Sequence, residues 1–312
     1  MSCDTLLPNI TFLKKGCRSV VTISVHACGG LGNQMFQYAF GRALSLAVGG
    51  NLTLQMDWFR KGERPFGLDA FLLHESLVLS TGKKLRERAT LKLFKRLRSM
   101  GIARERSLWG GVLLEPFPPR LVEVNFSEIS KLQSLYAEGY WQSETYFRCF
   151  REELLHDFTL TTVSPSAKKW LKRISSVQNS VGLHVRRGDY AADDSVREVH
   201  GLLPLEYYRR ADAIFREQGI EPIYFVFTDD TEWVKEHLSL PGEMFFVSES
   251  GCRDCEEMML MSRCSHNVVA NSSFSWWGGW LNASPSKVVV APSKWFQSMS
   301  GEHIVPESWR KI

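Results

Sequence analysis

The stretch Val181-Gly-Leu-His-Val-Arg-Arg-Gly-Asp-Tyr190 shows most clearly how the chain is organised. Its first five residues form a near-continuous apolar run, and Arg186 then begins a polar turn, which is typical of a buried strand and the loop after it. Apolar runs separated by helix-period segments recur downstream. They are predicted as strands at residues 223–228, 244–247, 267–270 and 287–291. Strands that alternate with helices pair in parallel, so the C-terminal half is predicted to be a parallel sheet covered by helices on both faces.

The N-terminal half shows a similar but more interrupted pattern. Apolar runs at 20–25 and 52–54 flank a glycine-rich turn and a helix-period segment at 36–47, which predicts strand, loop, helix and strand. Further on, residues 135–142 are predicted as a strand that enters a helix, and a linker is predicted near 159–166.

Length and composition limit the possible architectures. The 312 residues fit two domains of roughly 150 residues each. We predict an α/β fold with two Rossmann-like domains, residues 1–162 and 163–312, whose parallel sheets face a cleft. The composition, 44% hydrophobic and 23% charged with a net charge of +4, excludes a mainly disordered chain and a small disulfide-stapled protein.

Several features bear on the compartment. The two longest stretches without Asp, Glu, Lys or Arg, residues 19–41 and 264–286, contain His and Asn side chains that are costly in lipid, so no membrane-spanning helix is predicted. Seven Cys without a framework spacing favour a reducing compartment, and we predict a cytoplasmic protein. Five Asn-x-Ser/Thr sequences would suit secretion. However, those at Asn51 and Asn271 fall at a predicted strand start and in a predicted ligand loop, where a bulky glycan would be incompatible with folding.

Residues 83–106 carry ten Lys or Arg against Glu87 and Glu105, a local net charge of +8. Apolar residues at near-helical spacing predict an amphipathic basic helix that ends at Gly101. The apolar positions are Leu85, Ala89, Leu93, Leu97 and Met100. Two interpretations are open, a solvated helix face or a contact with an anionic membrane surface. Nucleic-acid binding is not predicted, because Phe94 is the only aromatic residue in the basic stretch.

The segment Gly29-Gly-Leu-Gly-Asn-Gln34 places three glycines between the first predicted strand and helix. Gly30 and Gly32 would let the backbone approach a ligand, and the side chains of Asn33 and Gln34 suit a sugar hydroxyl or an oxyanion. The segment is neither a Walker loop nor a G-x-G-x-x-G fingerprint. A purely structural tight turn is the alternative.

The turn after the 181–185 strand holds the most informative side chains. Strand alternation places His184 and Arg186 on one face, near the carboxyl end of the strand, where open α/β sheets bind ligands. A guanidinium fork matches phosphate oxygens and stabilises charge that accumulates on a leaving diphosphate. The alternative is that Arg186 or Arg187 pairs with Asp189 and that His184 is a satisfied core residue.

A pair of aspartates, Asp229 and Asp230, follows the predicted 223–228 strand. This position suits contact with a purine edge or a ribose. Alternatively, Asp229 and Glu232 form a capping box for the next helix.

The turn Asn271-Ser-Ser-Phe-Ser275 also follows a predicted strand and leads into a helix. Free N–H groups and hydroxyls at such a helix start suit an anion. The helix continues through Trp276, Trp277 and Trp280, which are predicted to be core residues rather than a stacking platform.

Metal-ligand patterns are weak. The chain has no Asp-x-Asp sequence, so the divalent-metal diphosphate site of many sugar transferases has no candidate ligands. Cys252-x-x-Cys255, with Cys264 and His266, offers four residues of zinc-ligand type in a spacing that fits no familiar module. We predict no metal and no cofactor.

Taken together, four blocks resemble the bacterial α-1,2-fucosyltransferases. They are Gly29-Gly-Leu-Gly-Asn-Gln-Met-Phe-Gln-Tyr-Ala-Phe, Gly139-Tyr-Trp-Gln, His184-Val-Arg-Arg-Gly-Asp-Tyr, and Met259-Leu-Met through Ala270-Asn-Ser-Ser-Phe-Ser-Trp-Trp. The combination is specific, although no single block is. The resemblance implies a GT-B fold, GDP-β-L-fucose as donor, metal independence, and inversion at the fucose anomeric carbon to form an α-1,2 link on a galactoside.

The resemblance also implies roles for individual residues. Arg186 would hold the β-phosphate and favour loss of GDP, His184 would lie against the nucleotide, and Asn33 would lie near the transferred sugar. The remaining donor-binding residues would be Gly30 and Gly32 of the first loop, Asp229 or Asp230 at the guanine or ribose, and Asn271, Ser272 and Ser273 at the diphosphate.

The implied mechanism is a single displacement in which the acceptor O2 attacks the fucosyl carbon as GDP departs. The acceptor proton needs a base, and Asp189 is the candidate by location, with Asp57 and Glu144 behind it. Alternatively, Asp189 pairs with Arg187 or accepts a hydrogen bond from a turn N–H. The acceptor, expected to be a galactose-terminated oligosaccharide, is open because residues 57–135 match nothing familiar.

Two rival functions come from other classes. A non-catalytic nucleotide-sugar or glycan-binding module would bind GDP without turnover. A nucleotide-dependent oxidoreductase suits the α/β pattern, but the missing G-x-G-x-x-G opposes it.

Overall fold

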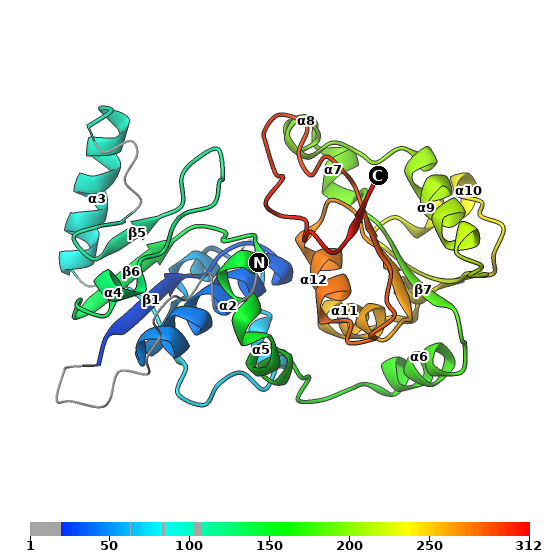
Figure 1. Cartoon of the computed structure of the whole chain (residues 1–312), viewed down its shortest axis with the longest axis horizontal. Coiled ribbons are helices and arrows are strands. Elements are labelled where there is room, and N and C mark those ends of the chain that lie inside the picture. Colours follow the sequence, from blue (N-terminus) through cyan, green and yellow to red (C-terminus); the bar gives the residue numbers. More distant parts are fainter. Residues whose placement is uncertain (1–19, 63, 83–84, 103–107) are drawn as a thin grey trace. The chain divides into compact units, whose positions relative to one another are not determined.

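The computed structural model describes residues 20–62, 64–82, 85–102 and 108–312 (Figure 1). Residues 83–84 and 103–107 of the basic stretch lie outside these ranges. The chain divides into two compact units. The N-terminal unit holds the residues up to Asp69 together with Leu73–Phe158, and the C-terminal unit holds Ala70–Leu72 and Thr159–Ile312. Residues 70–72 join the C-terminal unit through an antiparallel bridge between Phe71 and Leu160.

The C-terminal unit contains a six-stranded sheet in the order β12-β11-β10-β7-β8-β9, in which every neighbouring pair is parallel. Its strands are β7 (Ser180–Val185), β8 (Ile223–Thr228), β9 (Met244–Phe246), β10 (His266–Val268), β11 (Val289–Ala291) and β12 (Arg310–Lys311). The five strands predicted from apolar runs are confirmed. The short edge strand β12 is polar, and no apolar run signalled it.

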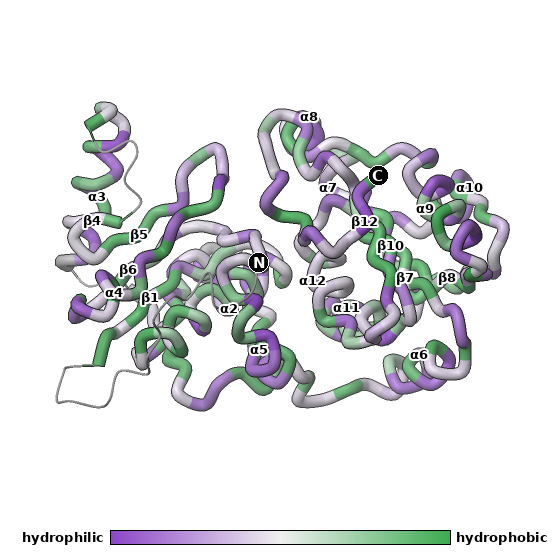
Figure 2. Tube along the Cα trace, in the orientation of Figure 1, coloured by the Kyte–Doolittle hydropathy of each residue, from purple (hydrophilic) through white to green (hydrophobic). Residues whose placement is uncertain are grey.

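Helices cover both faces of this sheet, as predicted. They are α6 (Pro165–Ser175), α7 (Gly188–Ala192), α8 (Asp194–His200), α9 (Leu205–Glu217), α10 (Thr231–His237), α11 (Asp254–Ser262) and α12 (Ser273–Leu281). Val181, Leu183 and Val185 of β7 pack in one core cluster with α9 and α10. The alternate residues face α11 and α12, since Gly182 lies against Met261 and His184 against Phe274. The central strands are mostly hydrophobic, whereas α9 and α10 carry both classes of residue (Figure 2).

The N-terminal unit contains a second six-stranded sheet, in the order β3-β2-β1-β6-β5-β4. Its strands are β1 (Thr22–His26), β2 (Asn51–Gln55), β3 (Val78–Ser80), β4 (Leu108–Trp109), β5 (Val112–Leu114) and β6 (Ser134–Glu138). Its helical elements are α2 (Leu31–Val48), α3 (Leu85–Ser99), α4 (Phe126–Ile129) and α5 (Arg151–Asp157), with short 3-10 turns between them. The α/β class with two Rossmann-like units is therefore confirmed.

One strand pair of this sheet departs from the predicted parallel pattern. Strands β4 and β5 are antiparallel and are joined by Gly110 and Gly111, which have φ values of +55° and +79°. Two successive residues with positive φ match the twist of a tight hairpin, and glycine adopts them without steric cost. This Gly-Gly pair was the available signal for the hairpin.

Helix α2 follows the first strand as predicted. It ends at Gly49, whose φ of +65° lets its N–H cap the last turn. Gly41 faces the sheet, where a Cβ atom would come within 2.6 Å of Leu52 and 2.7 Å of Val25. This close approach packs the middle of α2 against β1 and β2.

The basic helix α3 is confirmed, but its predicted apolar face is partly wrong. Leu93 and Met100 are exposed, whereas Leu91 and Phe94 are buried against Val112, Leu114 and Tyr136. Which stripe is buried depends on the strands that α3 packs against, and the spacing of apolar residues does not contain that information.

Candidate active site

The carboxyl ends of three adjacent strands bring most of the predicted site residues together in the C-terminal unit. β10, β7 and β8 are neighbours in the sheet. Arg186 follows β7, Asp229 follows β8, and Ser272 lies just after β10. Strand spacing of about 4.8 Å places these three turns within roughly 10 Å of one another.

Arg186 is held between two carboxylates. Its Nη2 lies 2.6 Å from Asp189 Oδ1, and its Nη1 lies 2.8 Å from Asp229 Oδ2. The buried Nε has no hydrogen-bond partner among the residues that the structure describes. The guanidinium is therefore fixed at the end of β7, and its buried Nε–H is not paired with any described residue. The alternative in which Arg186 pairs with Asp189 is confirmed, and Asp229 is a second partner.

Asp229 also fixes the turn that follows β7. Its Oδ1 accepts hydrogen bonds from the backbone N–H groups of Arg187 (2.8 Å) and Gly188 (3.0 Å). A Cβ atom on Gly188 would lie 2.5 Å from Asp229 Oδ2, so glycine is required there. Both oxygens of Asp229 are thus used within the protein, and its predicted contact with guanine or ribose stays a prediction.

The capping box predicted for Asp229 and Glu232 is wrong. The N-cap of α10 is Asp230, whose Oδ1 accepts from Trp233 N at 3.4 Å. Asp230 also pairs with Arg187 at 3.1 Å, and the Arg187 guanidinium lies 3.5 Å above the Trp233 ring. Asp189, the alternative partner for Arg187, pairs with Arg186 instead.

His184 is buried, and its ring centroid lies 5.2 Å from that of Phe274. Burial and the nearby Arg186 charge lower the pKa of His184 to about 3. The imidazole is therefore neutral near pH 7 and is not a proton donor there. Its buried Nδ1 has no hydrogen-bond partner within the described ranges.

This lowered pKa predicts a loss of stability in acid. Between pH 6.5 and 3 the unfolded chain binds a proton at His184 that the folded chain does not, so the free energy of unfolding decreases as pH falls. His184 alone contributes a slope of about 1.4 kcal/mol per pH unit within that window. We expect His184→Gln to flatten the decrease between pH 6 and 5, measured by urea unfolding. An equal slope of unfolding free energy against pH in the variant and the native chain would contradict the prediction. The other histidines are the same in both proteins, so their contribution cancels in the comparison.

The start of α12 provides free hydrogen-bonding groups. The Ser272 and Ser273 hydroxyls make no hydrogen bond to any described residue, and no side chain caps the helix. Asn271 is different, because its amide donates to the carbonyls of His200 (2.7 Å) and Gly201 (3.3 Å). The Asn271 side chain thus supports the loop, so a ligand role remains only for its backbone. Trp276, Trp277 and Trp280 are buried, which confirms them as core residues.

In the N-terminal unit, the glycine turn positions Asn33 at the start of α2. Gly29 has a φ of +78°, and a Cβ atom on Gly30 would meet nothing within 4 Å. Gly32 is buried within the helix. Asn33 Oδ1 accepts a hydrogen bond from Gln142 Nε2 at 2.7 Å.

Gln34 has a structural role, so the suggestion that it binds a ligand is wrong. It is buried, its Nε2 donates to the carbonyls of Gly29 and Pro65, and its Oε1 accepts from Gly67 N.

Sequence reasoning missed the contacts that hold the loop carrying Gln142. β6 ends at Glu138, and the loop after it is not the start of a helix, because α5 begins only at Arg151. Trp141 is buried with a φ of +57° and stacks on Phe40 at 4.0 Å. The Glu115 carboxylate accepts from the N–H groups of Tyr140 (2.6 Å) and Trp141 (3.1 Å). The Gly139-Tyr-Trp-Gln block marks this loop in the sequence, but its strained backbone is not visible in the motif.

Glu115→Gln is expected to destabilise this loop. Only one amide oxygen would remain to accept two N–H groups, and the new NH2 group would face a donor. We expect a loss of about 1–3 kcal/mol in the free energy of unfolding, measured with urea. Glu123→Gln, an exposed neighbour, is the matched control. A loss no larger than in the control would mean that Glu115 does not hold the loop.

The other candidate bases and ligands are placed as follows. Asp57 Oδ1 accepts from Gly82 N at 2.7 Å, and Glu144 lies in a 3-10 turn after β6. Cys252, Cys255 and Cys264 are free thiols, and within the described ranges no group of three His, Cys, Asp or Glu is arranged to hold a metal ion.

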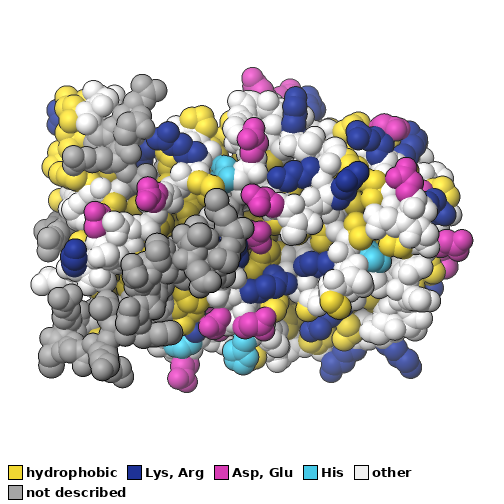
Figure 3. All heavy atoms as spheres, viewed as in Figure 1, with side chains coloured by type: hydrophobic (Ala, Val, Ile, Leu, Met, Phe, Trp, Pro, Cys, Tyr) yellow, Lys and Arg dark blue, Asp and Glu magenta, His cyan; other side chains and the backbone are white. Residues whose placement is uncertain are grey.

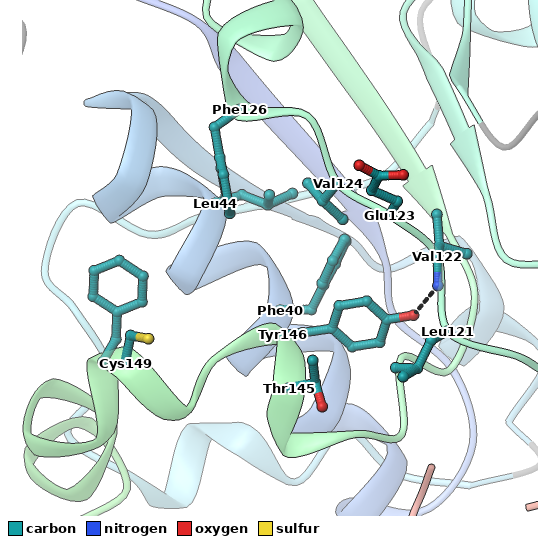
Figure 4. Close-up of a pocket in the computed structure, with 11 residues that line it drawn as sticks. Phe40, Leu44, Leu121, Val122, Glu123, Val124, Phe126, Thr145, Tyr146 and Cys149 are labelled. Carbon is teal, nitrogen blue, oxygen red and sulfur yellow. Dashed lines mark hydrogen bonds between the residues drawn. The ribbon is translucent and has the colours of Figure 1, made fainter. Parts of the chain in front are cut away.

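A separate apolar pocket of about 330 Å³ lies in the N-terminal unit between α2 and the 121–126 segment (Figure 4). Phe40 and Leu44 form one wall, and Tyr146 faces them with its hydroxyl bonded to Val122 N at 2.8 Å. None of the predicted site residues lines this pocket.

The surface and helices add two observations. On the face shown in Figure 3, described Lys and Arg side chains are interspersed with Asp and Glu. Of the helices in the described ranges, none has both the length and the apolar character needed to cross a bilayer.

Comparisons with known proteins identify relatives over most of the chain. The family described as glycosyl transferase family 11 matches residues 120–312. The O-antigen biosynthesis glycosyltransferase WbnK of Escherichia coli is 31% identical, covering 90% of this chain and 97% of that protein. An α-1,2-colitosyltransferase of Escherichia coli is 30% identical, covering 91% and 96%. Galactoside 2-α-L-fucosyltransferase SEC1 of Bos taurus is 29% identical over 49% of this chain and 43% of its own length.

A solved structure shares the fold. An Arabidopsis thaliana FUT1 mutant in complex with GDP aligns with a TM-score of 0.51 and 13% identity, covering 88% of this chain and 71% of that chain. The predicted GT-B-like fold is thereby confirmed.

Proposed function

This chain belongs to glycosyl transferase family 11, and from that we infer that it transfers L-fucose from GDP-β-L-fucose to O2 of a galactoside, forming an α-1,2 linkage. The observation that carries this proposal is that Arg186 follows β7 and the free start of α12 follows β10, the strand next to β7 in the sheet. A guanidinium with an unused N–H, two free serine hydroxyls and a helix N-terminus together favour a doubly charged diphosphate at this edge of the sheet.

The reaction we propose is a single displacement with inversion. The bond from the fucosyl anomeric carbon to the diphosphate oxygen breaks as the acceptor O2 bonds to the opposite side of that carbon. Negative charge accumulates on the departing GDP, where Arg186 and the N–H groups of α12 stabilise it. The acceptor proton leaves to a carboxylate, and Asp189 is the candidate. Because protein groups supply the positive charge, we propose that the reaction needs no divalent metal.

The identity of the donor sugar is the sharpest alternative within this proposal. One relative is named for colitosyl transfer and another for fucosyl transfer. Colitose is fucose without its 3-hydroxyl, so the two donors differ by one group that the protein must bind or exclude. A site built to hydrogen-bond a hydroxyl rejects the analogue that lacks it by about 10⁴-fold or more, whereas a site that ignores it discriminates weakly.

The test measures GDP release from GDP-fucose and from GDP-colitose in the presence of EDTA, with and without lactose. We expect release from GDP-fucose that depends on lactose, and a product whose fucose is α-1,2 linked by NMR. Faster turnover of GDP-colitose than of GDP-fucose would show that GDP-colitose is the donor. GDP binding without release, across an array of galactosides, would instead favour the non-catalytic module.

We further propose that the enzyme works in the cytoplasm and that α3 contacts the anionic inner membrane face. Lys92 and Arg96 are exposed, and so are the apolar side chains of Leu93, Met100 and Ile102. Basic side chains with apolar neighbours suit the headgroup region of an anionic bilayer.

This contact predicts a charge-dependent partition. Changing Lys95, Arg96 and Arg98 to Glu is expected to abolish sedimentation with phosphatidylglycerol vesicles. The control changes Lys168, Lys169 and Lys172 of α6 to Glu, which alters the net charge equally. Equal sedimentation of both variants and the native chain would exclude the α3 contact.

A further inference from the structure

Glu257 is an acidic side chain at the proposed donor edge of the C-terminal unit, and the proposed displacement makes no use of it. It lies in the N-terminal half of α11, which returns antiparallel to the strands and so begins at their carboxyl ends. Glu257 Oε2 accepts from Ser248 Oγ at 2.8 Å, and Ser248 Oγ accepts from Thr228 N at 3.0 Å. The carboxylate is thus two hydrogen bonds away from the last residue of β8.

The other acids of this region are already satisfied. Asp229 and Asp230 hold Arg186, Arg187 and backbone N–H groups. Glu256 is buried, and it accepts from Ser164 N at 2.6 Å and Arg253 N at 3.0 Å. Glu257 has no cation partner among the described residues, and its Oε1 makes no hydrogen bond to them. Burial raises the pKa of Glu257 to about 7, which a structural carboxylate with a full set of donors would not show.

The sheet order defines where the nucleoside of a bound donor lies. With the diphosphate at the ends of β10 and β7, the nucleoside extends toward either β8 and β9 or β11 and β12. On the second side, Ser293 N after β11 is bonded to the carbonyl of Ile312 at 2.7 Å, whereas the first side holds Glu257 with an oxygen that no described residue uses. Ser248 follows β9, at most three strand spacings, about 14 Å, from β10.

We propose that Glu257, supported by Ser248, reads the nucleoside of the donor by accepting hydrogen bonds from two adjacent donor groups. These groups are either N1–H and the 2-amino group of guanine, or the 2′- and 3′-hydroxyls of ribose. The inference rests on the proposed function, in which the donor is a GDP-sugar. It replaces the predicted contact from Asp229 or Asp230, whose oxygens are occupied.

The test compares the binding of GDP, IDP and 2′-deoxy-GDP by isothermal titration calorimetry. IDP lacks the 2-amino group, and 2′-deoxy-GDP lacks one ribose hydroxyl. Glu257→Gln keeps an oxygen that accepts from Ser248 but removes the paired acceptor. Glu249→Gln, an exposed acid in the 3-10 turn that holds Ser248, is the matched control. Ser248→Ala is a second variant, which keeps the carboxylate but removes its support.

At pH 8, where most of the Glu257 carboxyl is ionised, we expect Glu257→Gln to weaken GDP binding by about 10- to 100-fold, as for hydrogen bonds to a charged group. The variant should also lose the native preference for GDP over one analogue. That analogue is IDP if Glu257 binds guanine, and 2′-deoxy-GDP if Glu257 binds ribose. Ser248→Ala should reduce the same preference. Native discrimination retained in both variants would overturn the role of Glu257. No GDP binding by the native chain would instead refute the proposed donor, and this inference with it.

Discussion

Arg186→Ala is expected to lower kcat for lactose-dependent GDP release by about 10³-fold, which corresponds to about 4 kcal/mol of transition-state stabilisation. The guanidinium lies at the end of β7, fixed by Asp189 and Asp229, and an ion fixed in this way needs no reorganisation as charge forms on GDP. Its removal also leaves the carboxylates of Asp189 and Asp229 without their guanidinium partner. The loss should therefore exceed that of a single neutral donor.

The kinetic pattern separates this role from a structural one. Because the diphosphate gains charge in the transition state, kcat should fall more than the affinity for GDP measured by calorimetry. Arg186→Lys keeps the charge without the fork, and its rate should lie between those of the native chain and Arg186→Ala. Arg209→Ala, which removes an exposed arginine paired with Glu206, is the matched control. A kcat within tenfold of the control would show that Arg186 does not act on the leaving group.

Trp276→Ala is expected to cost about 3–5 kcal/mol in the free energy of unfolding. The indole is fully buried, its Nε1 donates to the carbonyl of Ile304 at 2.7 Å, and its ring packs on Trp280 and Trp309. Truncation leaves a cavity, and the Ile304 carbonyl loses its donor. The loss of stability should therefore exceed that of Glu115→Gln, which leaves the packing of the core unchanged.

Urea unfolding followed by far-UV circular dichroism measures this loss. Trp170→Ala is the control, because Trp170 is half-buried on α6 and makes one edge-on contact with Phe225. If the tryptophans of α12 formed a stacking platform for a ligand, Trp276→Ala would lower GDP affinity and leave the unfolding midpoint near that of the control.

Local pattern was sufficient for the central strands of both sheets, whereas the short strands β3, β4, β5 and β12 were not predicted. β8 was predicted at residues 223–228 and occurs there, because a short run of β-branched and aromatic residues bounded by turn residues favours a buried parallel strand. Helix α12 and its tryptophan core were likewise visible in the Asn271 turn and the spacing of the aromatic residues.

The partners of charged residues were harder to predict from the sequence. Asp189 and Asp229 both pair with Arg186, although Asp229 follows a different strand, far along the chain from Arg186. Sequence spacing suggested local roles for these aspartates. The pairing of Asp189 with Arg186 was confirmed, whereas its pairing with Arg187 and the helix cap by Asp229 were wrong. The left-handed backbone of Trp141 was equally hidden, since Glu115 holds it from the end of another strand.

The sequence by itself determined the α/β class, the central strands of both sheets and the family, because hydrophobic period and short motifs are local properties of the chain. Only the tertiary structure decided which oxygens of Asp229 are occupied, which stripe of α3 is buried, and which acid near β8 is left with an unused oxygen. Those outcomes depend on hydrogen bonds and packing between elements far apart in the chain. A carboxylate binds the donor that the fold brings to it, and its position along the chain does not specify that donor.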